Sequence, residues 1–499
     1  MSAFSGSLCA CSPSPVPARS PVSLRVGIAA PAAGLPGEGV PQFVSGYLTS
    51  ESLIGVGWDG RPVARLASEW AWADDRLSLR LQLHPNIRFH DGTRLEAPLA
   101  REFFQGVVNP STPAPFTVSF ASVTRVTSDD PLSLTFHLSR PEAFLLEDLA
   151  TVQLPHPTAA GFGTGPFKLM AADGEGAGTI EVPTVTRLEA FPDYYRGRAA
   201  VDLLEVRGYD EQRSAWAALV RGDIDAVHEV SPSAIDLVEG QKNVRTYSVV
   251  RPYYIALWFN LRHSVLKDAR IRRALSFAVD RRQLVEEGLS GRGEPSAGPV
   301  WPYHWAYTPA ERAYSLNREA ATIQLDMAGR RVKRQSADGR ASRFRFACLT
   351  LAGDRYEKVA LLLQRQLYDI GIDMAIDALP LRDVLQRVQS GNFETLLLER
   401  SSGRSLGLTY ATFHSRSSPV GYRATDSVLD RMRAATTDHA LRETVNEFHR
   451  VLYDDPPAIF LAWPTVTRAV RTNFVVPDEP SRTDVMSSLR LWHAAEPPE

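Results

Sequence analysis

Alternating apolar and polar positions predict several half-buried β-strands in this chain. The first strand is expected over Leu24-Arg25-Val26-Gly27-Ile28. Residues 69–83 and 123–138 repeat the period of two, with turn-forming residues beside them. A strongly apolar run from Tyr253 to Leu261 predicts a further strand. The first half of the chain is therefore expected to contain a β-rich region that ends at about residue 155.

Apolar residues spaced three and four positions apart predict amphipathic helices between the strands. One helix is expected to begin near Asp268, and Asp280 is expected to cap a second helix that stops at Gly291. A shorter helix over residues 217–221 is expected to end at Gly222 and to lead into a strand.

Two further segments indicate how strands and helices connect. Residues 343–351 and 372–376 predict strands, and residues 357–370 between them predict a helix, so the three form a βαβ unit. Such crossovers impose parallel strands and hence an α/β domain. A helical stripe over residues 441–452 is followed by a segment, residues 458–463, that predicts a returning strand.

Composition narrows the class of protein. The chain has 499 residues, enough for two or three domains, and 44% of them are hydrophobic. A net charge of -2 provides no long-range field for nucleic acid or anionic lipid. No apolar run reaches the roughly 18 residues of a membrane-spanning helix. The three cysteines permit no disulfide framework or zinc spacing, and Cys348 lies in a predicted buried strand where we expect an inert thiol.

The N-terminus has two open interpretations. Leu8-Cys9-Ala10-Cys11 is similar to a bacterial lipobox, in which Cys11 would be lipidated, and a Pro- and Ser-rich tether follows it. Residues 1–21 are thus expected to be a signal remnant or lipoprotein tether, or else a disordered tail. No charged and apolar signal segment precedes Cys9, so the gene start is expected to lie further upstream if the first interpretation holds.

Three motifs invite chemistry that the residues do not support. The glycine-rich segment 161–168 lacks the Gly-Lys-Ser/Thr ending of a phosphate loop, so we expect a tight bend before a strand. His84, His90 and Asp91 are explained by turn and strand structure, and no metal or cofactor is expected. The basic stretch 330–345 predicts a solvated hairpin edge, since the chain has no basic excess for nucleic acid.

The segment from His84 to Glu96 reads His-Pro-Asn-Ile-Arg-Phe-His-Asp-Gly-Thr-Arg-Leu-Glu. Its Asp91-Gly92 pair alone predicts a hairpin or a strand-to-helix turn. The segment also resembles the R-x-G-V-x-F-H-D-G-x-P-L-T-A motif of family 5 solute-binding proteins, the receptors of peptide, nickel and related ABC importers. Other segments resemble this family in the same order, namely residues 163–167 (G-T-G-P-F), 192–197, 217–225 and 268–281.

This resemblance implies an α/β fold of the two-lobed periplasmic-binding-protein type (type II), a clam with an extra β-rich inserted subdomain. The chain would cross between the lobes near Val249–Tyr253 and again near Trp463–Val466, and two crossings make a hinge. The expected division is lobe I at 22–46, 158–248 and 465–499, the inserted subdomain at 47–157, and lobe II at 249–464.

A ligand is expected between the lobes, so candidate contacts are residues on strand ends and loops. The resemblance places a ligand-contacting loop at Tyr47 and Thr49. Trp258 and Trp301 could supply large contact areas at low entropic cost. Each of these residues could equally belong to a core.

The chain departs from the family at residues 398–405. Peptide-binding members show W-x-x-D-Y-x-D-P there, and the first Asp pairs with the peptide's α-ammonium group. This chain has no such Asp, which puts a free peptide N-terminus in doubt as the ligand's handle. Arg400 and Arg404 could instead hold a carboxylate or phosphate, or both could face solvent.

The function that this resemblance implies is that of a substrate-binding receptor of an ABC importer. It would capture a peptide-like or other small solute, deliver it to permease subunits in the membrane, and make or break no bond. We expect a monomer that is periplasmic or at the cell surface, anchored by a lipid if Cys11 is acylated, with no nucleic-acid partner. One alternative is a serine esterase that uses Ser405 in Gly403-Arg404-Ser405-Leu406-Gly407. A cytoplasmic ligand sensor is a third hypothesis, but it would need a DNA-binding module, which is not expected before Leu24.

Overall fold

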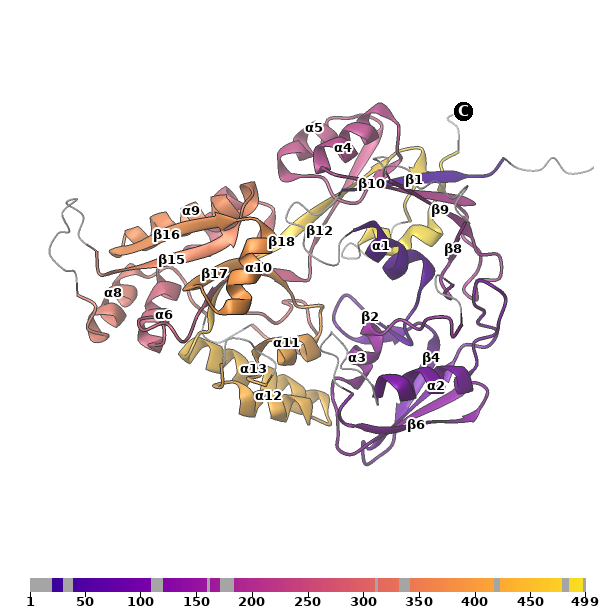
Figure 1. The fold of residues 1–499 in the computed structure, drawn as a ribbon, viewed down its shortest axis with the longest axis horizontal. Helices are drawn as coiled ribbons and strands as arrows, with labels where there is room; N and C mark the ends of the chain where they lie inside the picture. The colour runs from indigo at the N-terminus through magenta and orange to yellow at the C-terminus, as the bar shows by residue number, and fades with distance from the viewer. Residues whose placement is uncertain are drawn as a thin grey trace, which may run out of the picture.

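The computed structural model describes residues 20–29, 39–108, 120–158, 162–170, 184–309, 313–331, 342–416, 422–477 and 484–496. Across these ranges the chain forms a mixed α/β structure with two lobes joined by one large sheet, which confirms the predicted fold class (Figure 1). Cys11, nearly all of the N-terminal tether and residues 332–341 of the basic stretch lie outside the described ranges.

A twelve-stranded sheet runs through both lobes. Two of its strands, β12 (Val244–Val250) and β14 (Gly293–Pro295), pair only with β18. The others form one path in the order β16 (Ile372–Leu379), β15 (Phe344–Leu351), β17 (Thr395–Ser401), β13 (Tyr253–Phe259), β18 (Ala458–Arg471), β11 (Ala226–Val227), β1 (Ser23–Ala29), β10 (Leu203–Tyr209), β9 (Thr184–Ala190) and β8 (Phe167–Leu169).

The long strand β18 belongs to both lobes. Its first residues pair with β13, as in Ile459 opposite Leu257, and its last residues pair with β12, from Thr465 opposite Val250 to the end. The predicted returning strand therefore exists but continues for 14 residues instead of ending at Trp463. Strand β12 leads directly into β13. The chain therefore crosses between the lobes twice at this place, once between β12 and β13 and once within β18.

Lobe II contains the predicted βαβ unit. Strands β15 and β16 are parallel, and α9 (Asp354–Tyr368) connects them. The helix expected after Asp268 is α6 (Ala269–Phe277), and the Asp268 carboxylate accepts from the Arg270 backbone N–H at 2.9 Å. Asp280 caps α7 (Arg281–Gln283) as predicted, although this helix widens into a π-helical turn, η3 (Leu284–Gly288).

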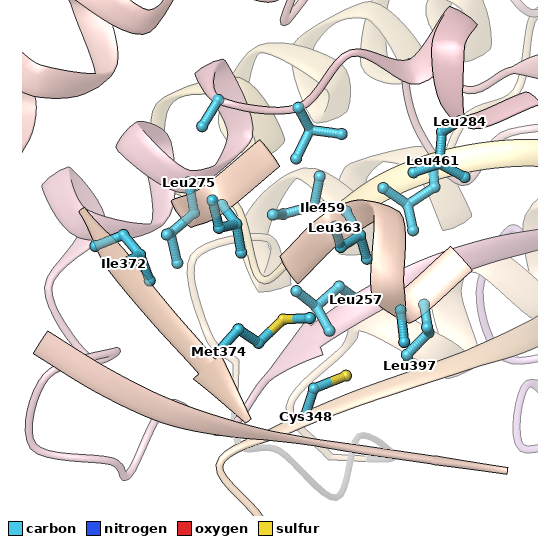
Figure 2. Close-up of a cluster of buried hydrophobic side chains, with 14 of the residues drawn as sticks. Leu257, Leu275, Leu284, Cys348, Leu363, Ile372, Met374, Leu397, Ile459 and Leu461 are labelled. Carbon is cyan, nitrogen blue, oxygen red and sulfur yellow. The ribbon is translucent and has the colours of Figure 1, made fainter. Parts of the chain in front are cut away.

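One core packs the helices of lobe II against its sheet (Figure 2). Leu257, Leu363 and Leu397 contribute to it from β13, α9 and β17, and all three are fully buried. Cys348 lies in the same core with no exposed surface, and burial raises the pKa of its thiol to about 12. The thiolate is thus inaccessible at neutral pH, in agreement with the inert thiol expected from the sequence.

The inserted subdomain is β-rich, as predicted, and has its own core. Its sheet has the order β4 (Ala67–Trp72), β5 (Ser78–Leu83), β7 (Ser133–Leu138) and β6 (Val123–Asp130). The helices α2 (Ala97–Val108) and α3 (Leu145–Thr151) pack with this sheet, burying Leu81, Phe104 and Phe136 completely.

The two most distinctive sequence motifs contact each other. The turn around Asp91-Gly92 leads into α2, and His90 stands at its centre, buried. Its backbone N–H donates to the Gly163 carbonyl at 3.0 Å, and its ring Nε2 lies 3.0 Å from the Gly165 carbonyl oxygen. The turn and the tight bend were both predicted, and their contact attaches the inserted subdomain to lobe I.

A buried carboxylate strengthens the same junction. Glu51, in the inserted subdomain, accepts from the hydroxyl groups of Tyr194 at 2.9 Å, Tyr195 at 3.2 Å and Thr164 at 3.2 Å, all from lobe I. Burial raises the pKa of Glu51, and these donors partly oppose that rise. Lobe I and the inserted subdomain are therefore held together as one half of the molecule.

The exact boundaries 22–46, 47–157, 158–248, 249–464 and 465–499 stay a prediction, and we keep the names lobe I, inserted subdomain and lobe II for these residues. Across the described ranges, no helix combines the length and the apolar character needed to cross a membrane.

Gly163 tests how closely the inserted subdomain packs on lobe I. A Cβ at this position would lie 1.9 Å from the Thr49 carbonyl oxygen, so Gly163→Ala must displace backbone. We expect a loss of about 1–3 kcal/mol, seen as a lower midpoint of thermal unfolding by circular dichroism. Gly106→Ala is the control, because that glycine lies exposed in α2 with nothing within 4 Å of its Cβ position and should not destabilise the protein. Equal midpoints for the two variants would contradict the close approach.

Candidate functional site

A cleft opens between the lobes beside the two crossing segments. Gln42 and Phe43 line it from lobe I, residues 249–253 from the β12–β13 crossing, and Arg404 from lobe II. Its volume, including space open to solvent, is about 990 Å³. Binding sites for small molecules commonly have volumes of about 300–1,000 Å³. We call this space the inter-lobe cleft.

The lobe I wall carries a paired cation. Arg468, in β18, donates Nη2 to the Asp484 carboxylate at 2.7 Å and Nε to its second oxygen at 3.2 Å. Its Nη1 also donates to the His228 carbonyl. Burial, together with the nearby charge of Arg468, lowers the pKa of the His228 ring to about 3, so this histidine is neutral at pH 7.

Tyr47, the first residue of the inserted subdomain, lines the cleft beside this wall. It lies in the π-helical segment η1 (Val44–Thr49), which follows the short helix α1 (Val40–Phe43). The Tyr47 side chain is 38% exposed, although its ring centroid lies only 5.2 Å from that of Phe43. An exposed ring on the wall of a cleft offers a ligand a flat apolar face and a hydroxyl group.

A second group of charges bridges the lobes at the crossing. Arg355, at the start of α9, lies 3.5 Å from the Glu229 carboxylate of lobe I and 3.6 Å from the Glu399 carboxylate of lobe II. Arg251, on the crossing segment, is 3.9 Å from the other Glu399 oxygen and stacks over the Tyr253 ring at 4.4 Å. Both cations thus have carboxylate neighbours.

Arg404 differs from the other cations that line the inter-lobe cleft. It occupies a turn with left-handed backbone (φ 57°), and its backbone N–H donates to the Ser402 hydroxyl at 3.3 Å. Its guanidinium lies 4.9 Å from the Trp58 ring centroid and 5.9 Å from that of Trp301. Among the described residues no carboxylate lies within ion-pair distance of it, and its Nε has no hydrogen-bond partner.

The surroundings of Arg404 disfavour an isolated charge. Burial lowers the pKa of Arg404, and the more distant Tyr47 and Asp484 only partly oppose this. The residue stays protonated, because an arginine is charged at any physiological pH. A partly desolvated cation gains most when an anionic group completes its hydrogen bonds.

The structure brings together two of the six predicted ligand-binding residues, Tyr47 and Arg404. Thr49 is 5% exposed, and its hydroxyl donates to the Val44 carbonyl. Trp258 is 7% exposed and stacks on Phe413 in the core of lobe II. Trp301 and Arg400 are also not among the residues that line the inter-lobe cleft.

Trp301 is 1% exposed and donates Nε1 to the Trp58 carbonyl at 2.9 Å, so it supports Arg404 from behind the wall of the cleft. Arg400 is exposed away from the lining residues, and its Nε donates to the Thr412 hydroxyl at 3.2 Å. Thr49, Trp258 and Trp301 are thus buried in packing contacts, and a role for them in ligand binding stays a prediction.

Several residues of the cleft were not identified from the sequence. Arg468, Asp484 and His228 belong to no motif that resembles the family, and Trp58 lies in a short turn. One signal was available for Arg468, because a charged residue at a position that reads as the interior of an apolar strand needs a partner. Its partner Asp484 lies 16 residues further along the chain and could not be assigned by spacing.

Ser405 has contacts that suit structure and not nucleophilic catalysis. It is the N-cap of α11 (Leu406–Phe413), where its hydroxyl accepts from the Leu408 N–H at 3.1 Å. The same hydroxyl donates to the Glu147 carboxylate of the inserted subdomain at 2.8 Å. Neither partner is a histidine, so these contacts give no support to the esterase hypothesis.

The metal hypothesis gains no support from the described part of the chain. It contains no cluster of three or more His, Cys, Asp or Glu side chains arranged to hold an ion. Asp91 accepts from the Thr93 backbone and hydroxyl groups, as a turn-forming aspartate does. The His84 ring packs on that of Tyr195 at 5.1 Å.

Comparison with known proteins places the chain among binding proteins. The oligopeptide-binding protein AppA of Bacillus subtilis is 24% identical over 352 residues, which cover 66% of this chain and 62% of AppA. The probable D,D-dipeptide-binding periplasmic protein DdpA of Escherichia coli is 24% identical over 428 residues, or 79% of this chain and 78% of DdpA.

Solved structures share the fold. The structure of NikZ from Campylobacter jejuni in complex with Ni(L-His) superposes with a TM-score of 0.78 at 19% identity, covering 94% of this chain and 99% of NikZ. Residues 61–418 match the family described as bacterial extracellular solute-binding proteins, family 5. The chain belongs to this family of solute-binding proteins, as its sequence motifs predicted.

Proposed function

We propose that this protein is the substrate-binding receptor of an ABC importer and that it captures a small solute with an anionic group in the inter-lobe cleft. The observation that carries the proposal is Arg404, a cation on an aromatic support at the cleft wall with no carboxylate partner among the described residues. The names of relatives that bind peptides support the general class of ligand.

The charges of the cleft favour an anionic over a cationic handle. The two lining carboxylates, Glu229 and Asp484, each lie beside an arginine, so neither is free to receive a ligand's ammonium group. The aspartate that serves this purpose in the peptide-binding motif is also missing from residues 398–405. A carboxylate or phosphate at Arg404 would instead complete a charge-assisted hydrogen-bond pair.

Tyr47 is the second proposed ligand contact, because it faces the same cleft from the inserted subdomain, which is fixed to lobe I. A solute that touched both Tyr47 and Arg404 would contact both halves of the molecule at once. Such a solute binds the closed arrangement better than the open one and therefore shifts the population toward closure. Capture in this account needs no catalytic group, so we propose a binding protein and not an enzyme.

Location and assembly complete the proposal. The family is described as extracellular, so we propose that the chain is exported and acts in the periplasm or at the cell surface. Lipidation at Cys11 would anchor it through the Pro- and Ser-rich tether. We propose that it acts as a monomer that delivers its solute to permease subunits in the membrane.

Native mass spectrometry of the protein purified from its own host provides the first test. We expect a bound small solute, and intrinsic tryptophan fluorescence should change when the solute is removed, because Trp58 and Trp301 lie under Arg404. Hydrolysis of p-nitrophenyl esters that is lost in Ser405→Ala, by a protein without bound solute, would favour the esterase instead.

A matched pair of variants tests the anionic handle. Arg404→Gln should weaken binding of the recovered solute, measured by calorimetry, by roughly 10- to 150-fold, since a hydrogen bond to a charged group contributes about 1.5–3 kcal/mol. Arg400→Gln removes the same charge outside the cleft and should leave the affinity within about twofold. A larger loss of affinity in Arg400→Gln than in Arg404→Gln would show that Arg404 does not bind the anionic group.

A further inference from the structure

The two halves of the molecule meet at a second place, away from the hinge. There the inserted subdomain contacts lobe II, and α3 lies beside α11 (Figure 1). Two backbone hydrogen bonds join them here. The backbone N–H of Trp305 donates to the backbone carbonyl of Asp59 at 2.8 Å, and that of Ala143 donates to the backbone carbonyl of Arg433 at 2.8 Å. Since the inserted subdomain is fixed to lobe I, these contacts would break if the two halves moved apart about the hinge.

Glu147 of α3 is the acidic centre of this contact. Its carboxylate, 7% exposed, accepts from the Ser405 hydroxyl at 2.8 Å and from the Gly407 backbone N–H at 3.0 Å. Both donors belong to the start of α11, immediately after Arg404. Glu147 therefore holds, by two hydrogen bonds, the turn that places Arg404 at the inter-lobe cleft.

Two other parts of the inserted subdomain hold the same turn. The Trp58 ring lies under the Arg404 guanidinium, and a Cβ on Gly60 would come within 2.8 Å of the Arg404 carbonyl oxygen. Gly60 also has φ +80°, so only glycine fits this position without strain. The left-handed conformation of Arg404 is thus enclosed by residues from the opposite half of the molecule.

The charges around Glu147 do not neutralise it. On its own segment it is close to Glu142 and Asp148, both acidic. From α12 (Asp426–Arg433), Arg433 pairs with Glu142 at 2.5 Å, and Asp430 accepts from the Tyr410 hydroxyl of α11 at 2.9 Å. His414, after α11, lies 3.3 Å from Asp430. The contact therefore contains three carboxyl groups of the inserted subdomain, and the guanidinium of Arg433 pairs with one of them, that of Glu142.

We propose that Glu147 is a positioning residue that holds the Arg404 turn in the closed state, and that closure of the two halves takes up a proton at this contact. The first part rests on the proposed role of Arg404 in ligand binding. The proton linkage does not, because it concerns the contact between the halves whatever the ligand is.

The direction of the linkage follows from burial. In the closed state, burial raises the pKa of Glu147 to about 7, and the Gly407 and Ser405 donors only partly oppose this. Burial and the neighbouring carboxylates raise the pKa of Asp148 as well. In the open state the Glu147 carboxyl group is hydrated, and its pKa returns to the ordinary value near 4.5. Between these two values the closed state binds a proton that the open state lacks, so rising pH favours opening.

Small-angle X-ray scattering of the protein, stripped of solute by dialysis, tests this at several values from about pH 5 to about pH 8.5. The open-to-closed ratio of the wild type should rise at least about tenfold over this interval, because each unit of pKa difference is tenfold in an equilibrium. In the double variant Glu147→Gln, Asp148→Asn, which keeps an acceptor for Gly407 and Ser405 but cannot ionise at either position, the rise should be at most about a third as large on a logarithmic scale.

Glu102→Gln is the matched control, since Glu102 is exposed on α2 of the same subdomain and should keep the wild-type pH profile. Glu147→Ala removes the acceptor and should be open at every pH, with thermal melting used to verify that it folds. A wild type that scatters identically at all pH values, or a Glu147→Gln, Asp148→Asn double variant with the full pH dependence, would overturn the proposal. Neither result depends on whether Arg404→Gln weakens solute binding, so the two proposals fail separately.

Discussion

Strand β18 holds the two lobes in one sheet, because it pairs with strands of both. Residues of its first part complete the sheet of lobe II through β13, and residues of its second part complete lobe I through β11 and β12. A continuous hydrogen-bonded strand cannot slide, so the lobes can only bend relative to each other about it. The inter-lobe cleft lies directly beside this crossing, and the halves meet again at the contact between α3 and α11.

The electrostatics of the cleft follow from how its charges are paired. Arg468 and Arg355 each lie beside carboxylates, and these pairs order the walls without providing a site for a charged ligand. Arg404 is instead supported by two indole rings and has lost part of its hydration. An ordered and incompletely satisfied cation binds an anion with little reorganisation, which is why this single residue determines the kind of solute that we propose.

Much of the fold could be predicted from the sequence, because local patterns were consistent with the tertiary structure. Asp268 and Asp280 cap the predicted helices, and Gly222 ends α4 (Gln212–Arg221) with φ +85°. The site was harder to predict. Trp258 and Trp301 have the side chains of ligand contacts, but packing between helices and sheet buried both, and no periodic pattern distinguishes a cleft aromatic from a core aromatic. Arg468 and Asp484 come together only through the tertiary fold.

Closure of the two halves over a solute can be measured directly as a distance. Spin labels on Arg101→Cys in α2 and Glu443→Cys in α13 (Asp438–Asp454), both exposed, would report the distance across the contact between α3 and α11 by electron–electron double resonance. Cys348 is buried and needs no replacement, whereas Cys9 and Cys11 would be changed to serine. We expect a broad distance distribution without solute, which becomes short and narrow when the recovered solute is added. The same distribution with and without solute would contradict closure over the solute.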